Sequence, residues 1–301
     1  MPSKFKETVF EDSYTSFIND SKTKGIVEID EVLKLVSVMQ ENEMDCHIII
    51  AGQNGSGKSF LELMIGKKKN KEKLFTNYFM ADKTTNDIIQ FLLSNEKATL
   101  CIDEMNLYLN YKQHASSEQN HLINMLELAR SKEIAIIGCI RDPRKLTLNY
   151  RDGKMSIILW VLDRFKDKSG AYAAILVGNP SLEGEDRFGI TWLDIRTPDF
   201  EDMRSQLENL PSFVGYLKIP SAKTVLTDQE LKDYKKYKNE AMAHAHLNQC
   251  LKRLKNKKMD MDEFSLQVEE LKKVLGEEIV ESKLLQLKSK TKTLKQFLED
   301  D

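Results

Sequence analysis

Eight consecutive residues in the first quarter of the chain have the types and spacing to bind the phosphates of a nucleotide. They fit the pattern G-x-x-x-x-G-K-[S/T] and are Gly52, Gln53, Asn54, Gly55, Ser56, Gly57, Lys58 and Ser59. The glycines allow the backbone to curl so that successive N–H groups point at a polyphosphate. Lys58 would reach the β and γ phosphates, and the Ser59 hydroxyl would be a ligand for Mg²⁺. The pattern therefore predicts a binding site for ATP and Mg²⁺.

Two adjacent acids, Asp103 and Glu104, follow the apolar run at residues 98–102. An aspartate at a strand tip can hold the water shell of Mg²⁺, and a neighbouring glutamate can polarise the water that attacks the γ-phosphate. The Asn-Lys-x-Asp tetrad with which GTPases read guanine does not occur in the sequence. Solvated acids at an ordinary strand end are the alternative interpretation. Together with the upstream glycine-rich loop, the pair favours ATP hydrolysis.

The segments that must position these residues alternate between short apolar runs and helical patterns. The glycine-rich loop lies between a predicted buried strand at residues 47–51 and the apolar start of a helix at 60–65, and a further helix is predicted over residues 32–39. Other predicted strands are residues 75–80, 99–102, 134–140 and 156–162, with helices at 87–93 and 121–130. This alternation predicts an α/β fold with a mostly parallel central sheet flanked by helices on both faces. Residues 171–177 are expected to form an antiparallel strand that closes the sheet edge. In such sheets ligands bind at the carboxyl ends of the strands, where Gly52, Asp103 and Arg141 would lie.

The composition changes after Pro220. Thr227 and Glu230 form a predicted capping box that opens a lysine-rich helix, and two more helices are predicted at residues 261–275 and 282–298. We therefore expect an ATPase domain over residues 1–220 and a charged helical C-terminal domain over 221–301. Such an appendage could bind DNA, bind a partner subunit or bind nothing.

The overall composition argues against three classes of protein: a strongly basic nucleic-acid-binding protein, a protein held by zinc or disulfides, and a membrane-spanning protein. The chain has 301 residues, with 45 Lys and Arg against 47 Asp and Glu, so nucleic-acid contacts would need local clusters. The basic run at residues 67–73 is one candidate, with a solvated loop as the alternative. The four cysteines show no C-x-x-C spacing, which supports neither a zinc site nor a disulfide framework. Apolar runs are too short to span a bilayer, and we expect a soluble cytoplasmic protein without membrane contact, associated with the virion if the source is a virus.

Residues 129–143 resemble the HerA/FtsK superfamily of DNA-pumping ATPases, which includes viral genome-packaging ATPases. The resemblance is carried by the pair Ala129-Arg130, by the strand led by Ile134 and by Pro143. Residues 157–162 resemble the next core strand of the family, so the resemblance covers residues 45–180. It implies a P-loop NTPase fold of the RecA-like ASCE type.

Arg141 departs from this family, which usually has glutamine at the same strand tip. A guanidinium in that place could contact the γ-phosphate, as a sensor arginine does in AAA+ proteins. The alternative is an arginine paired with Asp142 or Asp103 that has no catalytic effect.

The resemblance also implies a homo-oligomeric ring, expected to be a hexamer, with ATP at the subunit boundaries. An arginine finger would then come from the neighbouring subunit. Arg130 stands at the family's Ala-Arg position, and Arg144, Arg151 and Arg164 are the other candidates. The polar residues 110–117 could line a central channel, or they could form a plain surface loop.

These observations favour an ATP-hydrolysing motor that translocates or packages double-stranded DNA for a virus or mobile element. Glu104, Arg141 and Arg130 are the predicted catalytic residues, and a capsid or recruiting protein is an expected partner. One alternative is an AAA+ type ATPase that remodels a protein complex. Another is an assembly protein that binds ATP without turnover, and the presence of Glu104 argues against it.

Overall fold

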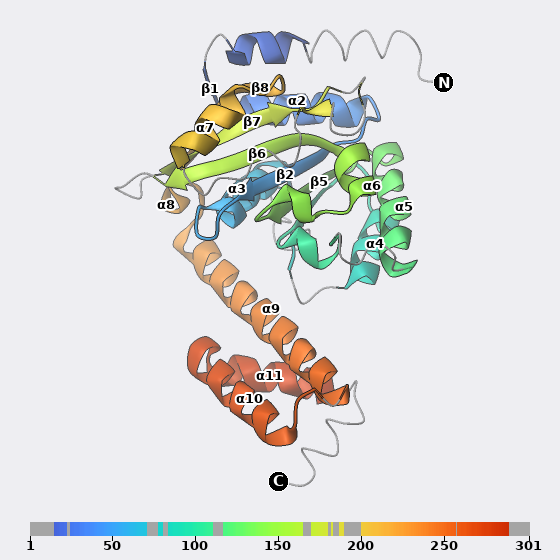
Figure 1. Cartoon of the computed structure of the whole chain (residues 1–301), viewed down its shortest axis with the longest axis vertical. Coiled ribbons are helices and arrows are strands. Elements are labelled where there is room, and N and C mark those ends of the chain that lie inside the picture. Colours follow the sequence, from blue (N-terminus) through green and yellow to red (C-terminus); the bar gives the residue numbers. More distant parts are fainter. Residues whose placement is uncertain are drawn as a thin grey trace. The chain divides into compact units, whose positions relative to one another are not determined.

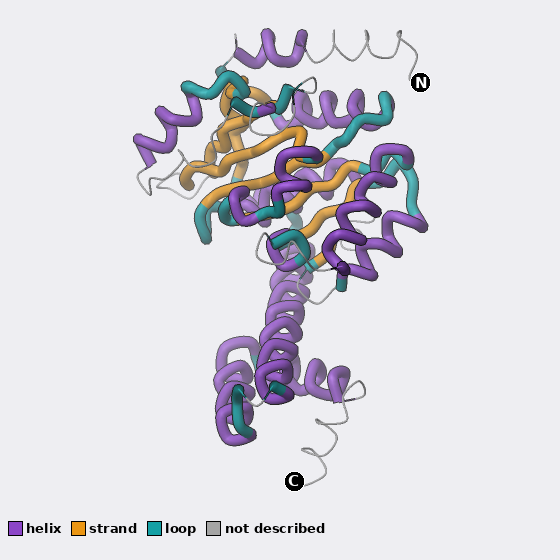
Figure 2. Tube along the Cα trace, turned by 45° about the vertical axis from the view of Figure 1, so that its right-hand side comes forward, coloured by secondary structure: helices purple, strands orange, loops and turns teal. Residues whose placement is uncertain are grey.

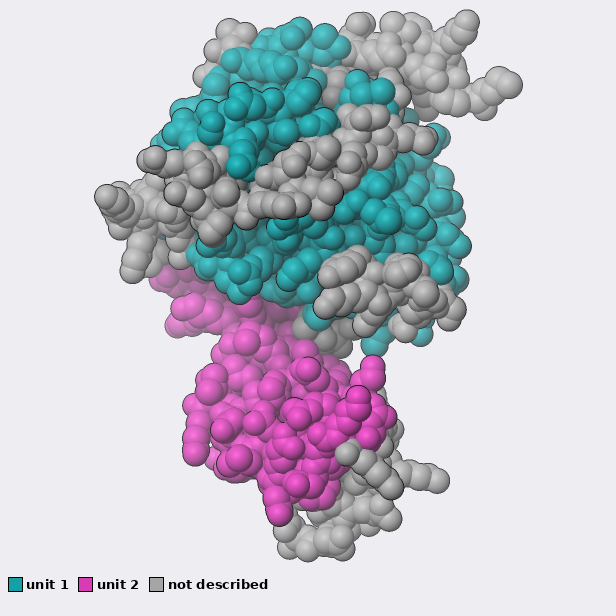
Figure 3. Space-filling model, in the orientation of Figure 1, with its two compact units in different colours: residues 1–79, 84–225 teal, residues 80–83, 226–301 magenta. Residues whose placement is uncertain are grey.

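The structure is a computed structural model of the whole chain. It describes residues 15–22, 25–70, 78–80, 84–110, 117–164, 170–179, 182, 187–189, 200–256 and 258–288. The chain divides into two compact units, one of residues 1–79 and 84–225 and the other of residues 80–83 and 226–301 (Figure 3).

The first unit is built on an eight-stranded sheet whose order is β1-β8-β7-β6-β2-β5-β4-β3 (Figure 1). The strands are β1 (Ile26–Val27), β2 (His47–Gly52), β3 (Tyr78–Phe79), β4 (Thr99–Ile102), β5 (Ala135–Ile140), β6 (Met155–Arg164), β7 (Gly170–Val177) and β8 (Phe213–Pro220). The five neighbours from β6 to β3 run parallel. The strand β7 is antiparallel to both β6 and β8, and β1 is parallel to β8.

Helices cover both faces of this sheet (Figures 1 and 2). Besides a helix at residues 15–22, the first unit contains α2 (Ile29–Glu41), α3 (Lys58–Asn70), α4 (Thr85–Ser94), α5 (Ser117–Ser131), α6 (Leu148–Gly153), α7 (Phe200–Glu208) and α8 (Ala222–Val225). One buried apolar cluster joins α4, α5, α6 and α7 to alternate residues of the central strands, such as Ile49 and Ile136. The helices α2 and α3 contact each other, and α3 packs on β2, β4 and β5. Because side chains alternate along a strand, the residues between those in the apolar cluster face α3.

The central strands confirm the predicted fold class, an α/β sheet that is mostly parallel and flanked by helices. Every residue of β2 is buried, as expected for a parallel strand covered on both faces. The strand β4, which ends before Asp103, is separated from β2 by β5 alone. The carboxyl ends of β2, β5 and β4 therefore meet at one edge of the sheet.

The prediction that residues 171–177 close the sheet edge is wrong. They form β7, and both β8 and β1 lie beyond it. Seven of the eight β7 residues are buried, and the edge of β7 that faces away from β6 is paired with β8. The sequence of β8 hides its strand character, because Gly215 and Lys218 interrupt its apolar residues. Of the predicted strand at 75–80, the structure describes β3, and residues 75–77 lie outside the described part.

The second unit consists of α9 (Asp228–Lys255), α10 (Met261–Leu275) and α11 (Glu277–Lys288). The predicted capping box is confirmed, since the Thr227 hydroxyl accepts from the Glu230 backbone and the Glu230 side chain returns to Thr227. The three helices pack on one another around buried residues that include Leu247, Phe264 and Val280. Here α11 starts before the predicted residue 282, and residues 289–298 lie outside the described part. Among the described helices, none combines the length and apolarity needed to cross a membrane.

Candidate active site

The glycine-rich loop joins the carboxyl end of β2 to the first turn of α3. Gly52 has φ +141°, and a Cβ atom there would lie 2.5 Å from the Val161 carbonyl oxygen of β6. Gly55 and Gly57 also have positive φ angles, +80° and +112°. Only glycine adopts such angles readily, so the loop can turn sharply against β6. The turn brings the N-terminus of α3, the positive end of the helix dipole, to the edge of the sheet.

Lys58 is folded over this loop. Its side chain is 9% exposed, and its Nζ donates a hydrogen bond of 2.7 Å to the Gln53 carbonyl oxygen. The Ser56 hydroxyl is also buried in the loop and has no hydrogen-bond partner in the described part of the chain. A positive charge and a buried donor inside one loop fit the phosphates of a nucleotide.

Ser59 and Asp103 come together from two elements that are far apart in the sequence. The Ser59 Oγ donates to Asp103 Oδ1 at 3.1 Å, and Asp103 is 3% exposed. The Asp103 backbone N–H donates to the Phe79 carbonyl oxygen, which continues the pairing of β4 with β3. Hydroxyl and carboxylate oxygens are the ligand types that Mg²⁺ prefers. The donor set therefore fits the predicted metal role of both residues.

Glu104 follows Asp103 in the left-handed conformation, with φ 58° and ψ 52°. This conformation is uncommon for a residue with a side chain and costs on the order of 1–3 kcal/mol. It is held by the next residue, Met105, which starts the short helix η2 (Met105–Leu107) and is fully buried. A Cβ atom at Gly138 would lie 2.3 Å from the Met105 sulfur, so glycine in β5 makes room for Met105. Glu104 is exposed at the same sheet edge as Asp103.

Glu62, a residue that no sequence pattern singled out, lies behind Asp103. It is 0% exposed, and its Oε2 accepts a hydrogen bond of 2.7 Å from the Tyr78 hydroxyl. Burial raises the pKa of Glu62 well above its ordinary value, and the charge of Asp103 raises it further. The available signal was a glutamate inside the apolar run 60–65, four residues after Lys58, which places both on one side of α3.

Arg141 directly follows β5 and is exposed. Among the described residues it forms no hydrogen bond or ion pair. Asp142 instead binds Arg144, whose Nε lies 2.8 Å from Asp142 Oδ1. The alternative in which Arg141 is neutralised by Asp142 or Asp103 is therefore not what the structure contains.

Three of the other predicted arginines are engaged in contacts within their own chain. Arg130 is in the last turn of α5, near the amino ends of β2 and β5, and its Nε donates to the Glu43 carbonyl oxygen at 2.6 Å. Arg144 is paired with Asp142, and Arg151 is paired with Asp152 at 2.9 Å. The Arg164 side chain and residues 111–116 of the predicted channel loop lie outside the described part.

The basic run after the glycine-rich loop is engaged within the first unit. Lys67 donates to the Val225 carbonyl oxygen, Lys68 pairs with Asp30 at 2.8 Å, and Lys69 donates to the Ser37 hydroxyl. Lys68 and Lys69 thereby fasten α3 to α2. Lys71 and Lys73 lie outside the described residues. These three lysines are thus committed to contacts within the chain, which weakens the prediction of a nucleic-acid cluster here.

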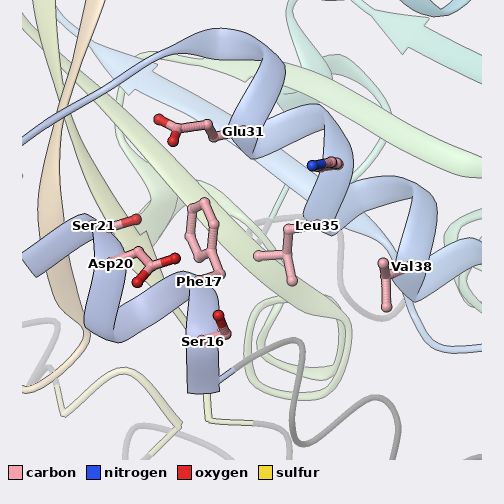
Figure 4. Close-up of a pocket in the computed structure, with 8 residues that line it drawn as sticks. Ser16, Phe17, Asp20, Ser21, Glu31, Leu35 and Val38 are labelled. Carbon is pink, nitrogen blue, oxygen red and sulfur yellow. The ribbon is translucent and has the colours of Figure 1, made fainter.

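One hollow of about 520 Å³ lies between the helix at residues 15–22 and α2. Figure 4 shows Phe17 pointing from this helix toward α2, with Asp20 and Glu31 at the margins. A second hollow, of about 350 Å³, is lined by residues of α5 and of the segment 144–151. Neither contains a residue of the glycine-rich loop.

No protein-family profile and no curated protein sequence matches the chain. Several solved structures share distant similarity with it, including the following three. The N-terminal domain of zonular occludens toxin from Neisseria meningitidis is 14% identical, with 44% of this chain and 83% of that chain covered and a TM-score of 0.34. The genome packaging NTPase B204 from Sulfolobus turreted icosahedral virus 2 matches in its ATP-gammaS complex with 14% identity, coverage of 44% and 92%, and a TM-score of 0.31. Its AMPPCP complex matches with 13% identity, coverage of 56% and 89%, and a TM-score of 0.31. At these TM-scores the likeness is too distant to assign residue roles or an activity.

Proposed function

We propose that the protein is an ATP-hydrolysing motor that translocates or packages double-stranded DNA. The observation that carries the ATPase part is the contact of Ser59 with Asp103 beside the glycine-rich loop, with Glu104 next to it. The DNA part rests on the resemblance of residues 129–143 to the HerA/FtsK superfamily.

In this proposal the loop N–H groups and Lys58 bind the β and γ phosphates. Ser59 and Asp103 would hold Mg²⁺, which neutralises phosphate charge when bound. Glu104 orients the attacking water and accepts its proton. Arg141 directly follows β5, the strand between β2 and β4, and reaches the γ-phosphate from within the same chain. Its lack of a carboxylate partner among the described residues supports this role, because an unpaired guanidinium keeps its full charge for the phosphate.

We expect Glu104→Gln to keep ATP bound while its hydrolysis falls by about 100-fold or more, because the amide cannot accept the proton of the water. Steady-state phosphate release and equilibrium binding of ATP would be measured on the same preparation. Glu133→Gln is a matched control, since Glu133 is also a left-handed glutamate, with φ 54°, and stands at the opposite edge of the sheet. Unchanged turnover of Glu104→Gln would mean that another acid orients the water.

The ring and its arginine finger also belong to the proposal. Arg144 and Arg151 are each ion-paired with an aspartate, whereas Arg130 contacts a neutral backbone carbonyl. A finger needs uncompensated positive charge, so among these three Arg130 is the best candidate. It lies at the sheet edge opposite its own glycine-rich loop, and it would therefore act on ATP bound by a neighbouring subunit.

We expect duplex DNA to stimulate ATP hydrolysis by the full chain several-fold, because translocation couples ATP hydrolysis to movement along the DNA. The rate would be measured with and without duplex DNA, with single-stranded DNA of equal length for comparison. If neither duplex nor single-stranded DNA changes the ATPase rate, the result would contradict the motor function and favour an ATPase that remodels a protein complex.

A further inference from the structure

A compact group of three acidic side chains lies beneath the surface of the proposed nucleotide site. Glu62 comes from α3, Asp103 from the tip of β4 and Cys139 from β5. One ligand atom of each lies within 4.8 Å of the other two, and all three residues are buried. The register explains the meeting, because Ile102 pairs with Gly138 and the next residues of both strands face α3.

One oxygen of the Glu62 carboxyl accepts a hydrogen bond, and the other lies on the side of Asp103 and Cys139. Its Oε2 is held by the Tyr78 hydroxyl, and Tyr78 is itself fully buried. Its Oε1 is completely buried and accepts no hydrogen bond of normal geometry from the described residues, although the Cys139 thiol and the Ile102 backbone lie beside the carboxyl. A buried polar atom without a partner is costly, by about 1–3 kcal/mol, and needs an explanation.

The chemistry of the three side chains suits a metal ion. Two carboxyl groups and a thiol lie within ligand distance of one another in a buried place. Carboxylate oxygens and thiolates both bind divalent metal ions, and such ligands release their protons as the metal binds.

We propose that Glu62, Asp103 and Cys139 form a binding site for a thiophilic divalent cation, with Zn²⁺ as the best fit. A thiolate selects zinc over magnesium, and carboxylate oxygens are common zinc ligands. Tetrahedral zinc with bonds of about 2.0–2.3 Å holds its ligand atoms roughly 3.5 Å apart, so small side-chain rotations would close the present spacing. The Ser59 hydroxyl, 3.1 Å from Asp103, or a water molecule would complete four ligands.

This site shares Asp103 with the proposed Mg²⁺ site. A zinc ion bound to Asp103 would compete with Mg²⁺ for this carboxylate. Zinc is therefore expected to inhibit ATP hydrolysis, and this consequence alone rests on the proposed function.

Direct binding tests the site without any need for turnover. The full chain, freed of metals, would be titrated with Cd²⁺, whose bond to a thiolate gives an ultraviolet charge-transfer band. We expect saturation at one equivalent and displacement by Zn²⁺. Cys139→Ser should lose the band, whereas Cys46→Ser should keep it, because the Cys46 thiol lies against the Val36 carbonyl oxygen at the other end of β2.

Glu62→Gln provides a second variant that preserves side-chain shape and the acceptor for Tyr78. Because loss of even an outer-shell partner weakens metal binding by about 10–100-fold, loss of a direct ligand should weaken Cd²⁺ binding by at least about 100-fold. Absence of the band in the wild-type chain, its persistence in Cys139→Ser, or unchanged affinity in Glu62→Gln would each overturn the proposal. One-equivalent binding with unaltered ATPase rate would support the site and contradict only the inhibition.

Discussion

Lys58→Ala is expected to abolish ATP binding as well as turnover. The Lys58 ammonium group lies over the loop backbone, 2.7 Å from the Gln53 carbonyl oxygen, where the β and γ phosphates would bring several negative charges together. A hydrogen bond to a charged group is worth about 1.5–3 kcal/mol, and Lys58 would contact two phosphates. Because about 2.7 kcal/mol corresponds to 100-fold, we expect the Kd for ATP to rise by at least about 100-fold. Titration calorimetry with Mg²⁺ and a slowly hydrolysed ATP analogue measures this directly.

Lys67→Ala is the matched control for this experiment. Lys67 is on the same helix, but it donates to the Val225 carbonyl oxygen and not to the loop. It should keep wild-type affinity if the effect of Lys58→Ala is local. Tight ATP binding by Lys58→Ala would show that the glycine-rich loop is not the phosphate site.

Arg130→Ala is expected to be nearly inactive alone and to recover activity in mixed rings. An arginine finger supplied by a neighbour is worth about 10³–10⁵ in rate. Lys58→Ala binds no ATP but keeps its own Arg130, so mixing the two variants creates boundaries that have both an intact loop and an intact finger. The ATPase rate would be followed against the mixing ratio, and it should pass through a maximum between two nearly inactive ends.

Two measurements protect this test from a folding artefact. Arg130 also donates to the Glu43 carbonyl oxygen, so thermal unfolding of Arg130→Ala must be compared with that of the wild type. Arg204→Ala removes an exposed arginine that is paired with Glu208, and it should keep full turnover. A fully active Arg130→Ala, or mixed rings without recovery, would refute the assignment and transfer the finger to Arg144, Arg151 or Arg164.

The sequence predicts those parts of the site whose residues are consecutive in the chain. The glycine-rich loop is one such segment, because its function depends on backbone angles that only glycine and a following helix start can supply. Asp103 and Glu104 are equally predictable, because these two acids directly follow an apolar strand. The meeting of Ser59 with Asp103 then follows from the general rule that ligands gather at the carboxyl ends of parallel strands.

The remaining features depend on contacts between segments that carry no common pattern. Glu62 and Cys139 each look like an isolated exception within an apolar run, and only the register of β4 with β5 brings Cys139 beside Asp103. The partners of Lys67, Lys68 and Lys69 were hidden for the same reason, because a run of lysines resembles a solvated loop in sequence. The sequence does not predict the strand β8, because Gly215 and Lys218 interrupt its apolar residues.

The central position of β2 has a consequence for where motion can arise. This strand is buried along its whole length and hydrogen-bonded to β5 on one side and β6 on the other. Segments of this kind open only with the global unfolding of a domain, so their amide hydrogens exchange slowest. The glycine-rich loop, which would bind the phosphates, thus directly follows a strand that is expected to exchange its amide hydrogens slowly. Structural changes during a cycle of ATP binding and release would therefore occur in the segments at the sheet edge, such as the strained turn at Glu104. The strand β2 itself would not move.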